Sequence, residues 1–374
     1  MGKWCAVEDL VTESFWRGKR VFVTGHTGFK GSWLCLWLTQ MGAKVTGFSL
    51  PAEDTSLFRQ ARIEHLIDHI EGDIRDAAQL KQALVAARPD VVFHLAAQPL
   101  VRLSYDCPVE TFATNVQGTV HLLDACRYAD GLKSVVCVTS DKCYENREWV
   151  WPYRESDPMG GYDPYSASKG AAELVIASYR RSFFSEPGAV GIASVRAGNV
   201  IGGGDWAADR LIPDIVRALI AGEQPLIRSP GSIRPWQHVL EALGGYLMIA
   251  ERIARGDARI ATAWNFGPAD DDTRPVAWIA DQMAALWGAS GWIDGSVGGA
   301  GQVHEANILK LDCAKARTEL GWRPAFSLKL ALDRIVSWHR GVASGADAQA
   351  VSLAQLSDYR NRFRENSRAG SSPK

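Results

Sequence analysis

Tyr165 and Lys169 form the first pair of side chains whose types and spacing suggest chemistry. They stand four residues apart in Tyr165-Ser166-Ala167-Ser168-Lys169, so a helix places both on one face. An ammonium beside a phenol stabilises the phenolate and lowers the pKa of the phenol. A phenolate can take a hydroxyl proton while a hydride leaves the same carbon. A surface Tyr and Lys can share this spacing by chance, so the interpretation depends on the surrounding sequence.

A second reactive group is the run Ser140-Asp141-Lys142, directly after the expected strand 134–139. Polar side chains at the carboxyl end of a strand in a parallel sheet lie where a functional site is expected. The structural alternatives are a turn-forming serine, a capping aspartate and a solvated loop lysine. The position just past a strand favours the catalytic interpretation.

The stretch Gly25-His26-Thr27-Gly28-Phe29-Lys30-Gly31 predicts a site for a dinucleotide pyrophosphate. It lies between an apolar strand pattern and an apolar helix pattern. Glycines let the backbone approach the phosphates, and the free N–H groups of the helix N-terminus face their charge. The first gap is one residue wider than in the commonest fingerprint, and three glycines can also form a plain turn. Ser49 occupies the place where an acid often binds the adenosine ribose, which leaves NAD and NADP both open.

The elements that must position these groups alternate between apolar strands and helices. This pattern predicts an α/β fold with a doubly wound parallel sheet, the Rossmann arrangement. The expected strands are 20–24, 44–49, 66–71, 91–95, 134–139 and 192–196, and the helices are 29–41, 76–87, 109–128 and 163–184. Polar groups follow the strands, so the site is expected at their carboxyl ends.

The rhythm changes after Gly198, which predicts a smaller mixed C-terminal lobe over the strand ends. We expect a dinucleotide-binding domain at 1–198, which segments near 240–268 rejoin, and a mainly substrate-binding lobe at 199–350. Residues 202–206 are glycine-rich and are expected to be a flexible loop. The polar segment 353–374 is expected to be a frayed tail.

Composition restricts the partners and the compartment. The formal net charge is −1, so bulk attraction to nucleic acid or to an anionic membrane is not expected. No apolar run is long enough to span a bilayer, and the N-terminus does not read as a secretory signal. The seven cysteines have no metal-site spacing, so we expect no metal, and they indicate a reducing, cytoplasmic compartment.

The chain resembles the extended branch of the short-chain dehydrogenase/reductase family over roughly 18–340. The resemblance rests on ordered motifs: the glycine turn, Gly72-Asp73-Ile74, Leu95-Ala96-Ala97-Gln98, Asn115-Val116-Gln117-Gly118-Thr119, the Tyr165–Lys169 pair and Arg234-Pro235-Trp236-Gln237-His238-Val239. Within that branch it is most similar to the nucleotide-sugar 4,6-dehydratases that act on CDP-glucose. The stretches that carry this closer similarity are 26–33, 97–102, Thr139-Ser140-Asp141-Lys142-Cys143-Tyr144 and 196–206.

The resemblance implies a redox-neutral reaction. Tyr165, assisted by Lys169, deprotonates the C4 hydroxyl as hydride passes to NAD, and Ser140 binds the C4 oxygen. Water then leaves across C5–C6, and the hydride returns to C6. Asp141 matches the acid for the departing hydroxyl, so it must hold a proton, and burial is expected to raise its pKa. Lys142 stands where most nucleotide-sugar 4,6-dehydratases carry a Glu base, a departure that defines the CDP-glucose group. As a base, Lys142 would have to be partly neutral.

The resemblance also implies the ligand contacts. The cofactor residues are Gly25, Thr27, Gly28, Phe29, Lys30, Gly31, Asp73, Ile74, Leu95, Ala96, Ala97, Gln98, Asn115, Thr139, Tyr165 and Lys169. The substrate side has Asn199, Arg210, Arg234 and His238. Asn115 has an equally good alternative as a helix-packing residue, and His238 fits packing better than ligation. A homodimer, or a tetramer, would form through helices near 109–128 and 163–184, and the implied pathway is deoxysugar biosynthesis for lipopolysaccharide O-antigen.

Three alternatives stay open at this point. A nucleotide-hexose C4 epimerase shares the scaffold and C4 oxidation, but it needs no acid or base at C5 and C6. An NADP-dependent reductase is compatible with Ser49. A non-enzymatic dinucleotide sensor could lose the catalytic pair, whereas Tyr165 and Lys169 are intact here.

Overall fold

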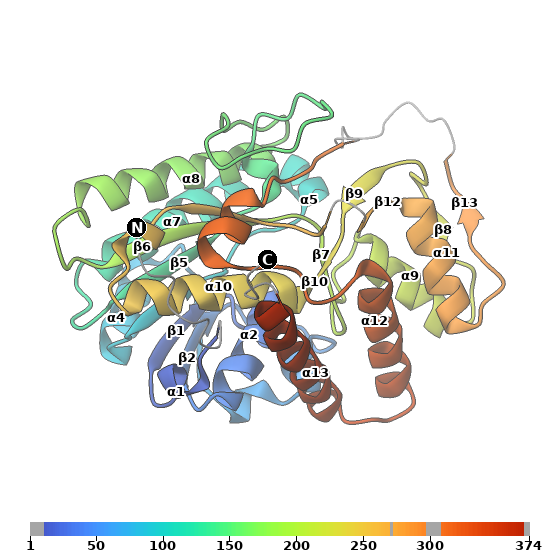
Figure 1. Ribbon diagram of the computed structural model, residues 1–374, viewed down its shortest axis with the longest axis horizontal. Coiled ribbons are helices and arrows are strands. Elements are labelled where there is room, and N and C mark those ends of the chain that lie inside the picture. The colour runs from blue at the N-terminus through green and yellow to red at the C-terminus, as the bar shows by residue number, and fades with distance from the viewer. Residues whose placement is uncertain (1–10, 270–271, 297–307, 370–374) are drawn as a thin grey trace.

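The computed structural model describes residues 11–269, 272–296 and 308–369, with side chains to residue 366 (Figure 1). Its centre is a seven-stranded sheet in the order β11-β6-β5-β4-β1-β2-β3, and every pair of neighbouring strands is parallel. The strands are β1 (Arg20–Thr24), β2 (Lys44–Ser49), β3 (Asp68–Glu71), β4 (Val91–His94), β5 (Ser134–Val138), β6 (Gly191–Ala197) and β11 (Ala263–Phe266). The predicted doubly wound parallel sheet is confirmed, and the expected return of the chain near 264–266 is β11.

Helices cover both faces of this sheet (Figure 1). One face carries α4 (Ala77–Ala87), α7 (Gly118–Cys126) and α8 (Pro164–Ser182). The opposite face carries α2 (Phe29–Gln40) and α10 (Val239–Ala254). This arrangement follows from crossover connections that place successive helices on the faces of a parallel sheet.

Side chains alternate between the two apolar cores along each strand. In β1, Val21 and Val23 belong to the core that contains α2 and α10, whereas Phe22 belongs to the core that contains α4 and α7. Strand geometry imposes this alternation because successive side chains point to opposite faces. Asp76 begins α4 as predicted, since its Oδ1 accepts from the N–H groups of Ala78 and Gln79, both at 3.0 Å.

The predicted helix 109–128 is interrupted in the structure. It consists of α6 (Pro108–Phe112), a π-helical turn η2 (Ala113–Gln117) and α7. The π turn contains Asn115, whose amide is fully engaged inside the protein as described below. The remaining short elements of this half are α1 (Glu13–Trp16), α3 (Leu57–Gln60), η1 (Ile63–His65), α5 (Val101–Asp106), η3 (Asp141–Cys143) and η4 (Ala258–Ile260).

A smaller group of elements lies beyond the carboxyl ends of the strands (Figure 1). It has its own apolar core, built from α9, α11, α12 and neighbouring residues such as Trp236. Its short strands pair as β7–β10, β8–β13 and β9–β12. The bounds are β7 (Val200–Ile201), α9 (Leu211–Ile220), β8 (Leu226–Ile227), β9 (Ile233–Pro235), β10 (Gln237–His238), β12 (Thr273–Pro275), α11 (Val276–Trp287), β13 (Ile293–Asp294) and α12 (Leu328–Ala343). The turn η6 (Ala316–Leu320) instead packs beside β11, in the larger core.

The expectation of a flexible loop at 202–206 is wrong. Gly202, Gly203, Gly204 and Asp205 are all buried. A Cβ on Gly203 would lie 2.2 Å from the Trp338 ring, and the Gly203 carbonyl accepts from Trp33 Nε1 at 2.9 Å. The glycines therefore serve close packing between α2 and α12 rather than mobility.

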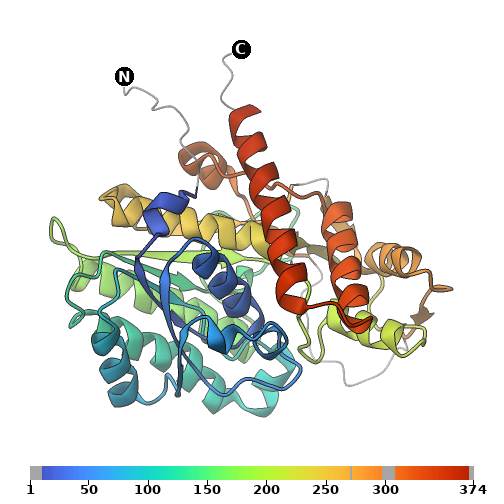
Figure 2. The ribbon, with the colours of Figure 1, turned by 90° about the horizontal axis from the view of Figure 1, so that it is seen from below.

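The expectation of a frayed tail at 353–374 is also wrong for residues 353–369, whereas 370–374 lie outside the described residues. Residues Ala348–Ala369 form helix α13, which runs beside α12 and crosses α2 and α3 (Figure 2). Leu356, Tyr359 and Phe363 are buried at its contact face. Three apolar side chains at spacings of three and four residues suffice to dock a helix whose other faces are polar.

Glu241 of α10 is a buried carboxylate that this C-terminal helix covers. Its Oε1 accepts from the N–H groups of Ala325 and Phe326, and Tyr359 Oη donates to its Oε2 at 3.1 Å. Burial raises the pKa of Glu241 from 4.5 to about 8, although these three hydrogen bonds act to lower it.

This raised pKa has a consequence for stability. A folded-state pKa above the unfolded value gives a contribution that is complete below pH 4.5 and is lost as the pH rises to about 8. We expect the Tm of the wild-type protein to fall across this range, and Glu241→Gln, which cannot ionise, to show a smaller decrease. Thermal unfolding at several pH values measures both slopes. Equal slopes in the two proteins would contradict the assignment.

Candidate active site

The glycine turn after β1 is held tightly against the end of β4. Gly25 has φ +72°, and a Cβ there would lie 2.6 Å from the backbone nitrogen of Ala96. A Cβ on Gly31 would lie 2.2 Å from the Gly25 carbonyl oxygen. Only glycine fits both positions, and Gly28 precedes the first residue of α2. The first N–H groups of α2, at Phe29, Lys30 and Gly31, stay free of intrahelical bonds and can receive an anion.

Thr27 and Ser49 close the turn on its β2 side. Their hydroxyl oxygens are 2.8 Å apart, and Thr27 Oγ1 also donates to the Leu50 carbonyl at 3.1 Å. Phe29 packs on the other side, where a Cβ on Gly202 would come within 2.9 Å of its ring. The turn therefore links the sheet to the smaller lobe.

Asp73 and Ile74 follow β3 as the sequence predicted, but their side chains are engaged within the protein. Asp73 forms an ion pair with Arg75 at 2.6 Å, and the hydrogen bond from Arg75 holds the pKa of Asp73 below its usual value. Ile74 is buried, and a Cβ on Gly118 of α7 would lie 2.5 Å from its side chain. Asp73 is thus closer to the surface, whereas Ile74 anchors this loop in the core.

Gln98 and Asn115 form a buried clamp behind the end of β4. Asn115 Oδ1 accepts from Gln98 N at 2.8 Å, and Asn115 Nδ2 donates to the Gln98 carbonyl at 3.1 Å and to Ser168 Oγ at 2.8 Å. The Gln98 side chain bonds back to Leu100 and Thr111. These contacts are the ones that the helix-packing alternative for Asn115 predicts. Gln98 is held in the same group of hydrogen bonds. Leu95, Ala96 and Ala97 precede the clamp and are half-buried.

Tyr165 lies at the start of α8, and its side chain is buried. Burial raises the pKa of Tyr165 to about 12, whereas a hydrogen bond with Ser140 and the charge of Arg210 act to lower it. The sequence led us to expect a lowered pKa for Tyr165, and the structure has it raised, because burial of the phenol outweighs the groups that lower it. Lys169 Nζ lies over the phenol ring, 6.0 Å from its centroid.

Lys169 is one turn further along α8 and is also buried. Burial lowers the pKa of Lys169 to about 8, although Cys143, Glu173 and Cys137 act to raise it. The amine therefore changes its charge close to neutral pH. This property suits a group that holds a ribose hydroxyl and responds to a developing charge nearby.

Asp141 begins the 3-10 turn η3 at the end of β5. It is buried, and burial raises its pKa above the usual value, although Lys142, Ser140, Lys30 and Arg234 act to lower it. Ser140 Oγ donates to Asp141 Oδ1 at 3.0 Å. The prediction that burial raises the pKa of Asp141 is thus confirmed.

Two neighbours complete this turn. The Lys142 N–H donates to Ser140 Oγ at 3.2 Å, and the Lys142 side chain is half-buried beside Asp141. The Thr139 hydroxyl, expected at the nicotinamide end, instead donates to Glu173 Oε1 at 2.6 Å. Gly198 leaves space for the acid, since a Cβ there would lie 2.9 Å from Asp141 Oδ2.

Lys30 reaches the centre of the site. Burial lowers the pKa of Lys30 to about 7, and the positive charges of Arg210 and Lys169 add to this effect, whereas Asp141 and Asp205 oppose it. The sequence placed Lys30 only at the pyrophosphate turn. Its proximity to α8 and η3 arises from long-range packing that no local pattern encodes.

The residues expected on the substrate side divide into two groups. Arg210 forms an ion pair with Asp205 at 3.1 Å, and its positive charge acts to lower the pKa of Tyr165. The positive charge of Arg234 in β9 acts to lower the pKa of Asp141. Asn199 follows β6, where its carbonyl accepts from Gln237 N. His238 is 1% exposed, its Nδ1 accepts from Leu240 N at the start of α10, and its ring contacts Trp33 and Phe326. These contacts are those of a buried helix cap, and they agree with the packing role that the sequence favoured over ligation.

The sequence reasoning missed three buried polar residues around the pair Tyr165 and Lys169. His94 bonds to Thr24 and Thr119, and burial together with the charge of Lys169 lowers the pKa of His94 to about 3. Glu173 and Arg196 form an ion pair at 2.8 Å. The four-residue step from Lys169 to Glu173 was the available signal for Glu173.

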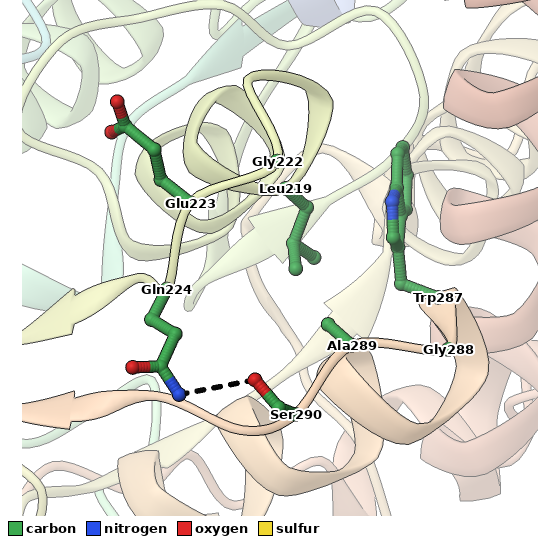
Figure 3. A pocket seen from close by; sticks show the side chains of 8 residues that line it. All are labelled: Leu219, Gly222, Glu223, Gln224, Trp287, Gly288, Ala289 and Ser290. Atoms are coloured by element: carbon green, nitrogen blue, oxygen red, sulfur yellow. Dashed lines mark hydrogen bonds between the residues drawn. The ribbon is translucent and has the colours of Figure 1, made fainter.

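A pocket elsewhere in the smaller lobe is not part of this site. It has a volume of about 250 Å³ and lies between the ends of α9 and α11, where Gln224 Nε2 donates to Ser290 Oγ (Figure 3). None of its lining residues belongs to the glycine turn, η3 or α8. In the part of the chain that the structure describes, no cluster of three or more His, Cys, Asp or Glu could hold a metal, and no helix has the length and apolarity to cross a bilayer.

Comparisons with known proteins show what the chain is similar to. Residues 21–267 match the model of the NAD dependent epimerase/dehydratase family. A CDP-glucose 4,6-dehydratase of Salmonella typhimurium is 55% identical over 357 residues, which cover 94% of this chain and 98% of that protein. The structure of DesIV, a dTDP-glucose 4,6-dehydratase from Streptomyces venezuelae with NAD and TYD bound, superposes with a TM-score of 0.74 at 25% identity, covering 88% and 99% of the two chains.

A UDP-glucose 4-epimerase of Mycolicibacterium smegmatis is also similar, at 28% identity over 86% of this chain and 98% of that protein. The matched model covers most of the chain and includes the glycine turn, η3 and α8. The chain therefore belongs to the NAD dependent epimerase/dehydratase family.

Proposed function

We propose that this protein is a lyase that converts CDP-glucose to CDP-4-keto-6-deoxyglucose. The observation that carries the proposal is the buried Asp141 carboxyl, with raised pKa, beside Ser140 and within reach of the charge on Lys142. An acid and an amine next to the Tyr165 phenol are what an elimination adjacent to a C4 ketone requires. The 55% identity to a CDP-glucose 4,6-dehydratase supports the same substrate.

The residues of the glycine turn fit NAD. At Gly25 and Gly31 the backbone of the turn lies so close to neighbouring backbone atoms that no side chain fits, and the turn leads into the N-terminus of α2, whose first N–H groups can bind a pyrophosphate. Bound there, NAD would supply a reversible hydride carrier between C4 and C6, so the reaction would be redox-neutral. Ser49 supplies a hydroxyl rather than a carboxylate near the ribose, so we expect weak cofactor retention.

The protein residues divide the proton transfers among them. Tyr165 takes the proton of the C4 hydroxyl, and Ser140 donates a hydrogen bond to the C4 oxygen. The resulting ketone acidifies the C5 proton, which Lys142 accepts and gives back to C5 when the hydride reaches C6. Asp141 gives its proton to the C6 hydroxyl, which leaves as water. Arg210 and Arg234, which lie around these groups, would bind the diphosphate.

Product analysis separates this function from C4 epimerisation. With CDP-glucose and NAD, the purified protein should form a 4-keto-6-deoxy sugar without net reduced cofactor. If CDP-galactose is the product, the epimerase assignment is correct instead. A panel of CDP-, dTDP-, UDP- and GDP-hexoses establishes the nucleotide preference, and net cofactor oxidation or reduction would indicate a simple reductase.

Lys142→Met should block elimination, since no amine is left to take the C5 proton. We expect dehydration to fall about 10²–10⁴-fold, the usual share of a general base, while C4 oxidation continues in part. Reduced cofactor and keto product are measured together by absorbance and chromatography. Lys133→Met, at an exposed position before β5, is the matched control. Full turnover in Lys142→Met would show that Lys142 is not the base.

We further propose a homodimer built on the helices α6 and α8. Val109 of α6 is 83% exposed and Leu174 of α8 is 62% exposed, although both are apolar. A group of exposed apolar side chains on neighbouring helices is the kind of surface at which two subunits associate. Val109→Asp with Leu174→Asp should give a monomer by light scattering, whereas Val150→Asp, at a position that is 71% exposed and outside these helices, should leave the oligomer intact. An unchanged mass in the double variant would rule out this interface.

The division of labour follows the architecture. We propose that residues 1–198 with the returning segment 240–268 bind the cofactor, and that residues 199–350 mainly bind the substrate. The reaction belongs in the cytoplasm, where the free thiols of Cys35, Cys126 and Cys137 would stay reduced. Its product suits deoxysugar biosynthesis, such as that of lipopolysaccharide O-antigen.

A further inference from the structure

Glu173 is a buried carboxylate that none of the proton transfers uses. It lies on α8, one helical turn after Lys169. Its Oε1 accepts from Thr139 Oγ1 at 2.6 Å and from Arg196 Nε at 2.8 Å. Its Oε2 accepts from Ser194 Oγ at 2.7 Å and from Arg196 Nη2 at 2.8 Å. Four short hydrogen bonds keep this carboxylate ionised and fixed in one position.

Arg196 of β6 extends the same network in the other direction. Its Nη1 donates to Tyr144 Oη at 2.7 Å and to the Glu155 carbonyl at 3.1 Å. Tyr144 Oη in turn donates to Asn265 Oδ1 at 2.7 Å, and the Tyr144 ring stacks on Tyr153 with centroids 5.2 Å apart. The guanidinium thus holds a side chain that directly follows the reactive turn.

The two arms of the pair reach opposite ends of one short element. Thr139 directly precedes Ser140, and Tyr144 directly follows η3. The turn is a single 3-10 turn with few backbone hydrogen bonds of its own, so its flanking residues largely fix its position. Gly170 of α8 adds a third contact, because a Cβ there would lie 3.1 Å from the Cys143 carbonyl oxygen.

We propose that the buried Glu173–Arg196 pair is a positioning unit for the turn that carries Ser140, Asp141 and Lys142, which it holds at both ends through Thr139 and Tyr144. Glu173 lies on α8, the helix that carries Tyr165 and Lys169. The pair therefore fixes the position of the turn with the elimination groups relative to the helix with the oxidation groups. The proposal rests on the proposed dehydration. It predicts that loosening either arm slows elimination more than C4 oxidation, since only the turn moves.

Two mild substitutions test the two arms. Thr139→Val keeps the shape of the side chain and removes its hydroxyl, and Thr139→Ser restores a hydroxyl. Tyr144→Phe removes the other hydroxyl and keeps the ring stack. We expect Thr139→Val and Tyr144→Phe each to lower kcat with CDP-glucose about tenfold or more, because misplacement of catalytic groups by a fraction of an ångström has effects of this order.

The diagnostic result is a split between the two half-reactions. In single turnover with NAD, both variants should accumulate reduced cofactor before the keto product forms, with little change in KM for NAD. Thr139→Ser should recover most of the wild-type rate. The matched control is Tyr359→Phe, which removes an equally buried hydroxyl bonded to Glu241, outside the site. Tyr359→Phe should lower the Tm without any accumulation of reduced cofactor during the turnover.

The opposite results are equally clear. If Thr139→Val and Tyr144→Phe lower the Tm but match Tyr359→Phe in kcat and in cofactor transient, the pair is structural only and the proposal is wrong. Failure of Thr139→Ser to recover activity would also overturn it. If the wild-type protein does not dehydrate CDP-glucose, the proposed function itself fails, and this outcome is distinguishable because it appears before any substitution.

Discussion

Asp141→Asn is expected to lower the rate of dehydration about 10²–10⁴-fold, the range over which a positioned general acid accelerates a reaction. The amide has nearly the same size and can still accept the hydrogen bond from Ser140, so the turn should keep its shape. It cannot give a proton to the departing C6 hydroxyl. C4 oxidation depends on Tyr165 and should continue in part, so reduced cofactor and a 4-keto hexose should accumulate.

Single-turnover absorbance of the cofactor, with chromatography of the sugar product, measures both steps. Burial raises the pKa of Asp141, and the carboxyl can act as an acid only while it is protonated. In the wild-type protein, elimination should therefore slow as the pH rises through this raised pKa. Asp257→Asn, in a partly exposed ion pair with Arg252 and Arg259, is the control and should retain full turnover. Near wild-type dehydration by Asp141→Asn would exclude Asp141 as the acid.

Tyr165→Phe should block the reaction one step earlier. Without the phenol no group takes the C4 hydroxyl proton, so we expect both reduced cofactor and keto product to fall about 10²–10⁴-fold. The pKa of Tyr165 is raised to about 12 by burial, so the fraction of phenolate, and with it C4 oxidation, should rise on the alkaline side in the wild-type protein. Asp141→Asn should therefore block elimination and leave C4 oxidation in part, whereas Tyr165→Phe should already block C4 oxidation.

Stopped-flow measurement of cofactor reduction across pH tests this prediction. Tyr179→Phe is the matched control, since Tyr179 lies on the same helix α8 and packs against Phe183, away from η3. Its rate and pH profile should equal those of the wild-type protein. Cofactor reduction at the wild-type rate in Tyr165→Phe would show that another group removes the proton.

Local patterns predicted much of the architecture. The strands β1 and β2 and the cap at Asp76 lie where the sequence put them, because strand burial, helix capping and glycine turns depend on neighbouring residues. The same locality explains the errors: residues 202–206 look mobile until Trp338 is seen against Gly203, and residues 353–369 look frayed until Trp37 and Glu241 are seen against Tyr359. Their partners are far away in the chain, so no window of sequence contains the contact.

The sequence by itself determined that a phenol, an amine, an acid and a glycine turn exist at the ends of parallel strands, since crossover connections bring those ends to one edge. Only the tertiary structure decided their electrical surroundings. The charges of Asp141 and Arg210 act on the pKa of Lys30, Glu173 pairs with Arg196, and burial raises the pKa of Tyr165 although the charge of Arg210 opposes it. Charge interactions depend on distance and burial in space, and helical spacing along the chain fixes neither.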